Sequence, residues 1–332
     1  TSPKQMSNTT QASIAPDAVP AEASIVIEGL SHRYKGGHQA LDGVNLSFGL
    51  GLYGLLGPNG AGKSTLMRII CTLLEPAAGQ VRVCGHDVTK DRQAVRALLG
   101  YLPQDFGGWR LHRVEEVLDT LAQMSGMLDK QKRQARVSEV LEQVGLAEVA
   151  DRKIKKLSGG MVRRLGVAQA LVHEPRILVV DEPTVGLDPE ERIRFRQLMT
   201  DLGRDRTIVL STHIVADLGA GCQEIAILDD GKILFQGPPP QLVAQATGHV
   251  FAISASAEDA EAIEERYEIV STSVSDGRIV LRGVAASDAL PPGADLVAEP
   301  TLEESYLAFM ATRGRSSAAR DDTESTPAGA GQ

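Results

Sequence analysis

Short runs of apolar residues recur along the first three quarters of the chain, and each has the length of a strand rather than of a helix. The run at residues 52–56 leads directly into a glycine-rich loop, and the aliphatic run at residues 177–180 is typical of a strand buried on both faces. The predicted strands are residues 24–28, 44–48, 52–56, 81–84, 98–102, 177–180, 207–210 and 225–228.

A helical period interrupts these strands in the middle of the chain, where apolar side chains recur at every third or fourth position. One face carries Val114, Val117, Leu118, Leu121, Met124 and Leu128, a second carries Val137, Val140, Leu141 and Val144, and a later one carries Phe195, Leu198, Met199 and Leu202. We expect a helical insertion at about residues 105–165 within an α/β fold. Because strands alternate with helices, the sheet should be parallel with helices on both sides.

A smaller pattern follows the three prolines at residues 238–240. Residues 251–255 alternate, residues 257–266 have a helical pattern, and two strand-like runs flank a turn at residues 275–277. Thr301 and Glu304 form a capping box that opens a last helix. We therefore predict a core at residues 24–238 and a small α+β accessory domain at residues 247–312. Residues 1–23 and 313–332 are predicted to be a disordered lead-in and a disordered tail.

Composition and charge narrow the possible functions. A net charge of -9 argues against a nucleic-acid binder and against direct adsorption to anionic lipid. No run approaches the roughly 20 apolar residues that cross a bilayer, and residues 1–23 lack a signal pattern, so any membrane association should come through a partner. The three cysteines, Cys71, Cys84 and Cys222, are too scattered for a CxxC unit and are expected to be buried thiols in a reducing cytoplasm.

The glycine-rich loop is the first candidate site. The pattern Gly57-x4-Gly62-Lys63-Ser64 lies between a predicted strand and a predicted helix. Glycines allow backbone N–H groups to point at phosphate oxygens, and the helix N-terminus adds a partial positive charge. The Lys63 ammonium should reach the β- and γ-phosphates, and the Ser64 hydroxyl should bind Mg²⁺. The loop therefore predicts a nucleoside triphosphate site.

Two carboxylates follow the aliphatic strand at residues 177–180, where ligands bind in open α/β sheets. Asp181 is expected to hold Mg²⁺ through a water, and Glu182 is expected to act as the general base on the attacking water. The alternative is that both residues are simply a solvated strand end.

A second glycine-containing helix start lies far from the first, at Leu157-Ser158-Gly159-Gly160-Met161. With this segment, residues 25–238 resemble the nucleotide-binding domain of ABC transporters. The resemblance implies a P-loop NTPase core with an N-terminal antiparallel β subdomain and an inserted helical signature subdomain. It also implies that the Ser158 segment contacts the γ-phosphate of ATP bound by the opposite subunit, so that one site is shared between two copies.

Further residues match the motifs of this family by position. Gln104 matches the glutamine that senses Mg²⁺ and water, His213 the switch histidine, Asp188 an aspartate of the dimer interface, and Tyr34 the aromatic that stacks on adenine, although Tyr34 could equally be a packing residue. The resemblance implies catalytic Glu182, His213, Gln104 and Lys63; Mg²⁺ ligands Ser64, Gln104 and Asp181; and ATP contacts from Tyr34, Gly57, Asn59, Gly60, Gly62, Lys63, Ser64, Thr65, Ser158, Gly159, Gly160 and Asp188.

Two departures bear on which branch of the family this is. Met161 replaces a common glutamine, and residues 107–112 depart from the usual sequence in the segment that lines the groove for a membrane subunit. Trp109 in that segment is either a docking aromatic or local core. The order of motifs, Met161 and the accessory unit resemble the ATPase subunit of a bacterial two-component exporter of drugs, antibiotics or lipids, whereas the departure at residues 107–112 leaves the identity of the membrane subunit open.

The resemblance implies a homodimer or heterodimer of nucleotide-binding domains on the cytoplasmic face of a membrane, held there by separate transmembrane permease subunits. The alternatives are an importer ATPase, a soluble ATPase in assembly such as iron–sulfur assembly, and a regulator that binds nucleotide without turnover. The accessory unit is expected to be a dimerisation or regulatory cap that packs on the core.

Overall fold

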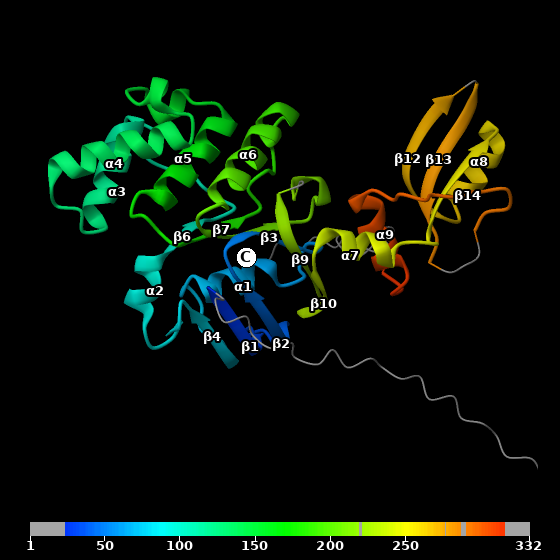
Figure 1. Ribbon diagram of the computed structural model, residues 1–332, viewed down its shortest axis with the longest axis horizontal. Coiled ribbons are helices and arrows are strands. Elements are labelled where there is room, and N and C mark those ends of the chain that lie inside the picture. The colour runs from blue at the N-terminus through cyan, green and yellow to red at the C-terminus, as the bar shows by residue number, and fades with distance from the viewer. Residues whose placement is uncertain (1–23, 219–220, 276, 287–289, 316–332) are drawn as a thin grey trace, which may run out of the picture.

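The computed structural model describes residues 24–218, 221–275, 277–286 and 290–315, arranged around three sheets (Figure 1). The predicted lead-in at residues 1–23 and the predicted tail from residue 316 onward lie outside the described residues. Arg315, which falls within the tail predicted from residue 313, forms ion pairs with Asp229 and Asp230. The chain therefore keeps contact with the core up to Arg315.

The first sheet is antiparallel and consists of β1 (Ile25–Arg33), β2 (Gln39–Phe48), β4 (Ala78–Val83) and β5 (His86–Asp87), in the order β2-β1-β4-β5. Its buried face shares a hydrophobic cluster with α1 (Lys63–Ile70), which packs through Leu66, Met67 and Ile70. This is the N-terminal antiparallel unit that the sequence resemblance implies.

The second sheet has six strands in the order β10-β9-β3-β8-β7-β6. Five of them are parallel, and β10 pairs antiparallel with β9 at one edge. The strands are β3 (Gly51–Leu56), β6 (Leu99–Leu102), β7 (Ile177–Asp181), β8 (Thr207–Thr212), β9 (Cys222–Asp229) and β10 (Lys232–Gly237). All residues of β3, β7 and β8 are buried, as their unbroken apolar runs predict.

The helical insertion and α6 share one buried cluster with the sheet. Figure 1 shows these helices gathered above one face of the sheet, with α1 below it. The elements are α3 (Val114–Met124), α4 (Lys130–Gln143), η1 (Ala147–Val149), η2 (Ile154–Lys156), α5 (Gly159–Leu171) and α6 (Pro189–Leu202), while α2 (Arg92–Leu98) leads into β6. The strands thus have helices on both sides.

The third sheet, in the order β12-β13-β11-β14, is entirely antiparallel and belongs to the C-terminal part of the chain. It consists of β11 (Val250–Ala255), β12 (Glu268–Ser275), β13 (Arg278–Val284) and β14 (Asp295–Leu296), and α8 (Ala257–Glu264) packs on it. The pairing of β12 with β13 confirms the predicted hairpin, although Asp276 of its turn lies outside the described residues.

The last helix, α9 (Leu302–Ala311), returns from this third sheet to the core. It packs against α7 (Pro239–Gln245) and against η3 (Val215–Asp217), and its Phe309 ring meets the Phe235 ring edge-on at 5.8 Å. The helix α7 was not predicted, because prolines at residues 238–240 read as a chain breaker. Pro239 instead occupies the first helical position, where a missing N–H costs nothing.

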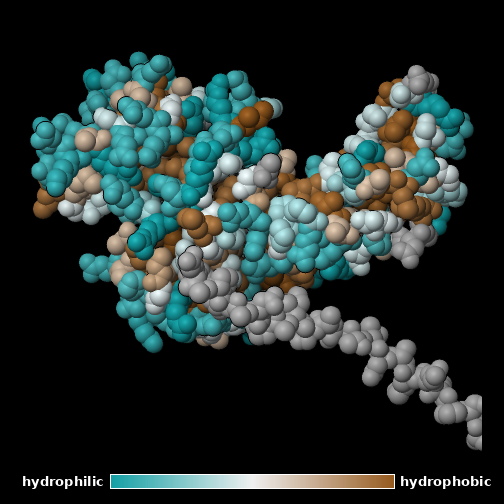
Figure 2. All heavy atoms as spheres, in the orientation of Figure 1, coloured by the Kyte–Doolittle hydropathy of each residue, from teal (hydrophilic) through white to brown (hydrophobic). Residues whose placement is uncertain are grey.

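The surface over the helical insertion is largely hydrophilic (Figure 2). Among the described residues, no helix is long and apolar enough to cross a membrane. Cys71 and Cys222 are buried, as predicted, and burial raises the pKa of both thiols, that of Cys222 to about 12. Cys84 is only half-buried, because it follows the end of β4.

Candidate functional site

The carboxyl ends of the parallel strands bring the predicted site segments to one edge of the central sheet. Leu56 pairs with Thr212, so the glycine loop and His213 leave neighbouring strands side by side. Asp181 pairs with Ser211 on the other side of β8, and β6, which precedes Gln104, pairs with β7. Segments that are more than a hundred residues apart in sequence therefore meet where ligands bind in open α/β sheets.

The glycine loop is shaped by close backbone contacts. A side-chain Cβ at Gly57 would lie 2.1 Å from the carbonyl oxygen of Leu228, and one at Gly62 would lie 2.3 Å from that of Ala40. Gly62 also has a φ of +106° and caps α1 without a side-chain hydrogen bond. The first N–H groups of α1 are thus left without a side-chain cap and can serve an anion such as phosphate. The loop fits the triphosphate that its sequence predicts.

Lys63, Glu182 and His213 form a continuous polar chain at this edge. The Lys63 ammonium donates to the carbonyl oxygens of Gly57 at 2.6 Å and Pro58 at 3.0 Å, and lies 3.1 Å from Glu182 Oε1. The other oxygen of Glu182, Oε2, is 2.7 Å from His213 Nδ1. Lys63 and Glu182 are buried, whereas the His213 side chain is 38% exposed. Three residues predicted to act on ATP are therefore in direct contact.

Glu182 adopts an uncommon backbone conformation, with a φ of +46°. Its N–H donates to the Ser211 hydroxyl at 3.1 Å, and that hydroxyl donates to Asp181 Oδ1 at 2.5 Å. Ser211 thus holds the Asp181 carboxylate and the backbone of Glu182 at the end of β7. Burial, followed by the charge of Asp181, raises the pKa of Tyr101 and of Cys71. Both groups therefore stay neutral at physiological pH.

Tyr34 lies beside the glycine loop rather than in the core. Its hydroxyl is 3.0 Å from the Thr65 hydroxyl in α1, and its ring meets the His32 ring edge-on at 4.9 Å. The side chain is 37% exposed. The ring is therefore both anchored and accessible, as the predicted stacking on adenine requires.

Gln104 follows β6 in an exposed segment that contacts α5. The Arg163 guanidinium donates to the carbonyl oxygen of Gln104 at 2.6 Å, and burial lowers the pKa of this guanidinium. This bond connects the core directly to the helical insertion. Arg163 was not predicted from the sequence. It lies next to Arg164 in a helix, and nothing in the sequence distinguishes the arginine that contacts Gln104 from its neighbour.

Ser158 and Asp188 each cap a helix. The Ser158 hydroxyl accepts from the N–H of Met161 at 3.2 Å at the start of α5, and the Asp188 carboxylate accepts from the N–H of Glu191 at 2.9 Å at the start of α6. A Cβ at Gly160 would collide with the Glu191 carboxylate, so α5 and α6 approach each other closely there. The contacts of Ser158 lie within the helical insertion, and Ser158 and Gly159 are exposed.

The predicted Mg²⁺ ligands include oxygen donors of the kind this ion prefers, namely the Ser64 hydroxyl and the Asp181 carboxylate. Ser64 is half-buried at the start of α1, and Asp181 is buried at the end of β7. Among the described residues, there is no cluster of three or more His, Cys, Asp or Glu side chains that could hold a metal by themselves. The residues present therefore fit an ion that takes its remaining ligands from water and phosphate.

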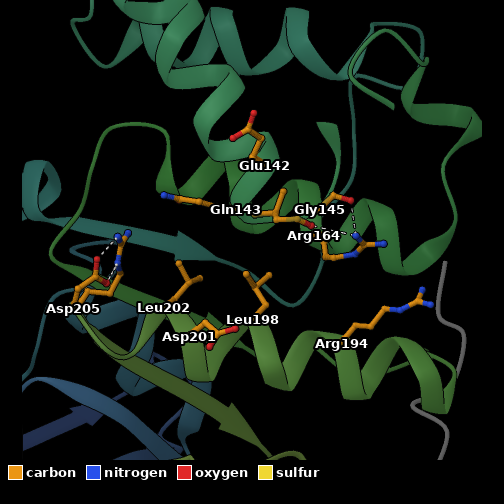
Figure 3. Close-up of a pocket in the computed structure, with 11 residues that line it drawn as sticks. Glu142, Gln143, Gly145, Arg164, Arg194, Leu198, Asp201, Leu202 and Asp205 are labelled. Atoms are coloured by element: carbon orange, nitrogen blue, oxygen red, sulfur yellow. Dashed lines mark hydrogen bonds and ion pairs between the residues drawn. The ribbon is translucent and has the colours of Figure 1, made fainter. Parts of the chain in front are cut away.

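Among the described residues, two cavities outside the glycine loop bear on the site. One of about 520 Å³ separates α4 and α5 from α6, and Figure 3 shows Arg164 reaching from α5 to the carbonyl oxygen of Gly145 at its margin. The other, of about 240 Å³, is lined by Phe106, Trp109 and Leu157 and adjoins the Gln104 segment. Trp109 is 45% exposed and meets His112 edge-on, so it is not a core residue.

Comparison with known proteins gives consistent results. The sequence model of the ABC transporter family matches residues 41–185. The chain is 36% identical over 236 residues to the daunorubicin resistance ATP-binding protein DrrA3 of Streptomyces coeruleorubidus, covering 69% of this chain and 72% of that protein. It is also 36% identical over 229 residues to the Nod factor export ATP-binding protein I of Paraburkholderia xenovorans, covering 68% of this chain and 75% of that protein.

Solved structures agree on the fold. The dimeric structure of a bacterial ABC transporter cassette, at 28% identity, covers 64% of this chain and 98% of that chain with a TM-score of 0.58. The match to a component of an ABC transporter complex from Clostridium perfringens, at 24% identity, covers 74% of this chain and 96% of that chain with a TM-score of 0.63. The α/β fold with a P-loop NTPase core is thereby confirmed.

Proposed function

The chain belongs to the family of ABC transporter ATP-binding proteins, which are ATPases, and from that premise we propose that it powers an exporter through a pair of nucleotide-binding units. The observation that carries the ATP hydrolysis in this proposal is the contact of Lys63 and His213 with the two oxygens of Glu182. A cation for the phosphates, a carboxylate for the attacking water and a histidine beside that carboxylate are what ATP hydrolysis at this edge requires.

In the proposed reaction the glycine loop and Lys63 bind the phosphates, and Glu182 accepts a proton from the attacking water. Bound ATP would have to displace Lys63 from the carbonyl oxygens of Gly57 and Pro58 and separate it from Glu182. This exchange would free the Glu182 carboxylate to meet water. When bound, Mg²⁺ would be held by Ser64 and Asp181, with Gln104 reaching it from the neighbouring segment, and would neutralise phosphate charge.

The second half of each site is proposed to come from another nucleotide-binding unit, either a copy of this chain or a related one. Ser158 starts α5 in an exposed position, where its backbone N–H groups can meet a phosphate held elsewhere. Asp188 starts α6 in the same exposed manner. ATP bridging two units favours the closed pair because it makes contacts there that it lacks in the open one, and hydrolysis removes the bridge.

Mixed pairs test the shared site. Copies with Lys63→Ala and copies with Ser158→Arg should each be inactive alone, because each such pair lacks the same half of both sites. Mixed in equal amounts, they should regain ATP hydrolysis, since a mixed pair contains one intact site. Absence of any recovery, with mixed pairs demonstrated by two different affinity tags, would overturn the shared-site arrangement.

Transport requires a membrane partner, and we propose that separate permease subunits hold this chain at the cytoplasmic face of the membrane. The groove beside Gln104 supports this, because exposed Trp109 lies there next to apolar Phe106 and Leu157. The segment also contacts α5 through Arg163, so a partner seated there would sense movement of the Ser158 helix. Export is the direction we propose, because DrrA3 is named for daunorubicin resistance and the Paraburkholderia protein for Nod factor export.

Purification from detergent-solubilised native membranes tests the transport role. A Glu182→Gln variant with ATP and Mg²⁺ should hold the closed pair together with its partners, because the attacking water loses its base. A copurifying protein with several membrane spans supports the exporter proposal. Soluble partners alone, for example scaffold proteins of iron–sulfur assembly, would instead favour a soluble assembly ATPase.

A further inference from the structure

Asp217 connects the segment that follows Glu182 with the segment that contains His213. Its carboxylate accepts hydrogen bonds from the hydroxyls of Thr184 and Thr212, the latter at 3.1 Å. All three side chains are buried, with exposed fractions of 5%, 1% and 0% respectively. Thr184 lies two residues after Glu182, and Thr212 immediately precedes His213. One carboxylate therefore sets the spacing between the segment of the proposed base and the segment of the histidine.

The Thr212 hydroxyl also shapes the turn that contains His213. It accepts from the N–H of Ile214 at 2.9 Å while it donates to Asp217. The His213 side chain is more exposed than its neighbours, so packing alone does not hold it. Its direction toward Glu182 depends on this hydrogen-bonded turn and hence on Asp217.

Asp217 lies at the end of η3, and the C-terminal helix α9 packs against η3. Phe309 and Met310 of α9 belong to the same buried cluster as Val215 and Leu218, which flank Asp217 closely in sequence. All four are 5% exposed or less. The accessory unit thus reaches, through its last helix, the short element that anchors the histidine turn.

We propose that Asp217 is a positioning residue for ATP hydrolysis and that α9 holds it in place, so that the accessory unit influences the hydrolysis rate. Asp217 does not act on ATP; it keeps His213 against Glu182. A shift of η3 by a fraction of an ångström lengthens the contact between His213 and Glu182, and misplacement on this scale lowers turnover. This inference rests on the role proposed for His213.

Kinetics of the full chain with ATP and Mg²⁺ test the role of Asp217. Asp217→Ala should lower kcat roughly 10- to 100-fold while KM for ATP changes less than about twofold. Asp217→Asn retains an oxygen acceptor of the same shape and should restore most of the rate. Assays run well below the unfolding midpoint of each variant separate positioning from loss of fold. Equal rates for wild type and Asp217→Ala would overturn the inference.

Two substitutions within α9 test the connection to the accessory unit. Met310→Ala shortens a side chain in the cluster shared with η3, whereas Leu307→Ala shortens one that packs against the accessory sheet. Met310→Ala should lower kcat severalfold, whereas Leu307→Ala should leave it unchanged. In a double variant, Met310→Ala should lower kcat little further than Asp217→Ala alone, because both substitutions act through η3. Equal effects of the two α9 variants would exclude the connection.

His213→Ala, measured alongside, distinguishes the two levels of failure. If His213→Ala loses activity while Asp217→Ala and Met310→Ala do not, the positioning inference is wrong and the proposed function stands. If His213→Ala hydrolyses ATP like the wild type, the role proposed for the histidine is wrong, and the inference falls with it.

Discussion

Gly62 illustrates how single positions control the nucleotide loop. Its φ of +106° lies in the left-handed region, and a Cβ there would lie 2.3 Å from a backbone oxygen that cannot move aside freely. Gly60 also has a positive φ, of +78°, but a Cβ at Gly60 would meet no atom within 4 Å. A side chain at Gly60 would therefore meet backbone strain alone, whereas one at Gly62 would meet both strain and a steric collision.

Replacing each by alanine should have different results. Gly62→Ala should destabilise the fold by about 2–4 kcal/mol and abolish ATP binding, because the start of α1 must move away from β2. Gly60→Ala should cost only about 1 kcal/mol through strain. Urea unfolding and titration with a fluorescent ATP analogue measure both effects. Equal losses for the two variants would show that strain, and not the contact with Ala40, decides.

The residues that carry phosphate chemistry were predictable, because loop glycines, a lysine and paired carboxylates in order along the chain leave few other interpretations. Lys63, Glu182 and His213 are indeed in contact. Ser211 and Asp217 were not predicted, since a serine or an aspartate near a strand end is common and only the fold shows what it bonds. For Tyr34, the sequence left open whether the ring stacks on adenine or packs in the core. The bond between its hydroxyl and Thr65, which places it beside the glycine loop, is visible only in the fold.

At the level of elements, helix starts serve two purposes in this protein. Ser158 caps α5 through a bond to the N–H three residues later, and Ser256 caps α8 in the same way, each at 3.2 Å. The two caps therefore accept the same backbone bond, and the Ser256 hydroxyl in addition donates to Asp259 Oδ2 at 2.7 Å. Only the first lies in a segment proposed to meet phosphate.

Ser158→Ala and Ser256→Ala should each cost about 1 kcal/mol of stability, the usual contribution of an N-cap. Ser158→Ala should in addition lower ATP hydrolysis well beyond what this loss of stability explains, whereas Ser256→Ala should leave the rate unchanged. Denaturant unfolding and steady-state ATPase assays measure the two quantities. Similar rates for both variants would reduce Ser158 to a structural cap.

The start of α9 makes its stability depend on pH. Arg282 donates to the two oxygens of Glu304 at 2.6 and 2.9 Å, and the Thr301 N–H donates to it at 2.7 Å. Burial raises the pKa of Glu304, but these hydrogen bonds outweigh burial and bring the pKa below the ordinary value of 4.5. The charged carboxylate therefore stabilises the fold above pH 4.5, and this contribution is lost as pH falls through the lowered pKa.

Glu304→Gln should accordingly reduce the free energy of unfolding by about 1–3 kcal/mol at pH 7, the cost of weakening hydrogen bonds to a charged group. The difference from wild type should shrink as the pH falls from 4.5 through the lowered pKa, because the wild-type carboxylate becomes protonated first in the unfolded chain and then in the folded one. Glu303→Gln, at the exposed neighbouring position, should change stability little at any pH. A difference that stays constant down to acid pH would contradict this account.

Elements were predicted where the apolar period was long or unbroken, as in β7 and α3. The strand β10 was missed because its exposed positions break the apolar run, and it forms only by pairing with β9 at the sheet edge. The return of α9 to the core was expected only in outline. Its amphipathic pattern shows that a face is buried but not which partner buries it.

For the molecule as a whole, the accessory unit contributes buried side chains to the core through α9. Truncation before residue 247 removes Phe309 and Met310 from the shared cluster and should cost about 3–6 kcal/mol, at roughly 1.5–3 kcal/mol for each buried side chain. ATP binding should persist at low temperature, because no residue of the glycine loop is lost. Thermal unfolding without ATP measures the loss of stability, and the increase in Tm on adding ATP measures ATP binding. Leu296→Ser in the exposed strand β14 serves as the control and should change neither.

The return of α9 also has a consequence for biosynthesis. Phe235 and Leu242 leave the ribosome 74 and 67 residues before Phe309, which completes their cluster. A nascent chain that has already formed its nucleotide loop thus carries an uncovered apolar surface until α9 emerges, the condition in which chaperones are recruited. At translation rates of about 5–20 residues per second, this interval lasts for several seconds. Formation of α9 is therefore a late step of folding, and a stop codon between residues 242 and 302 would leave a chain that is able to bind ATP yet prone to aggregate.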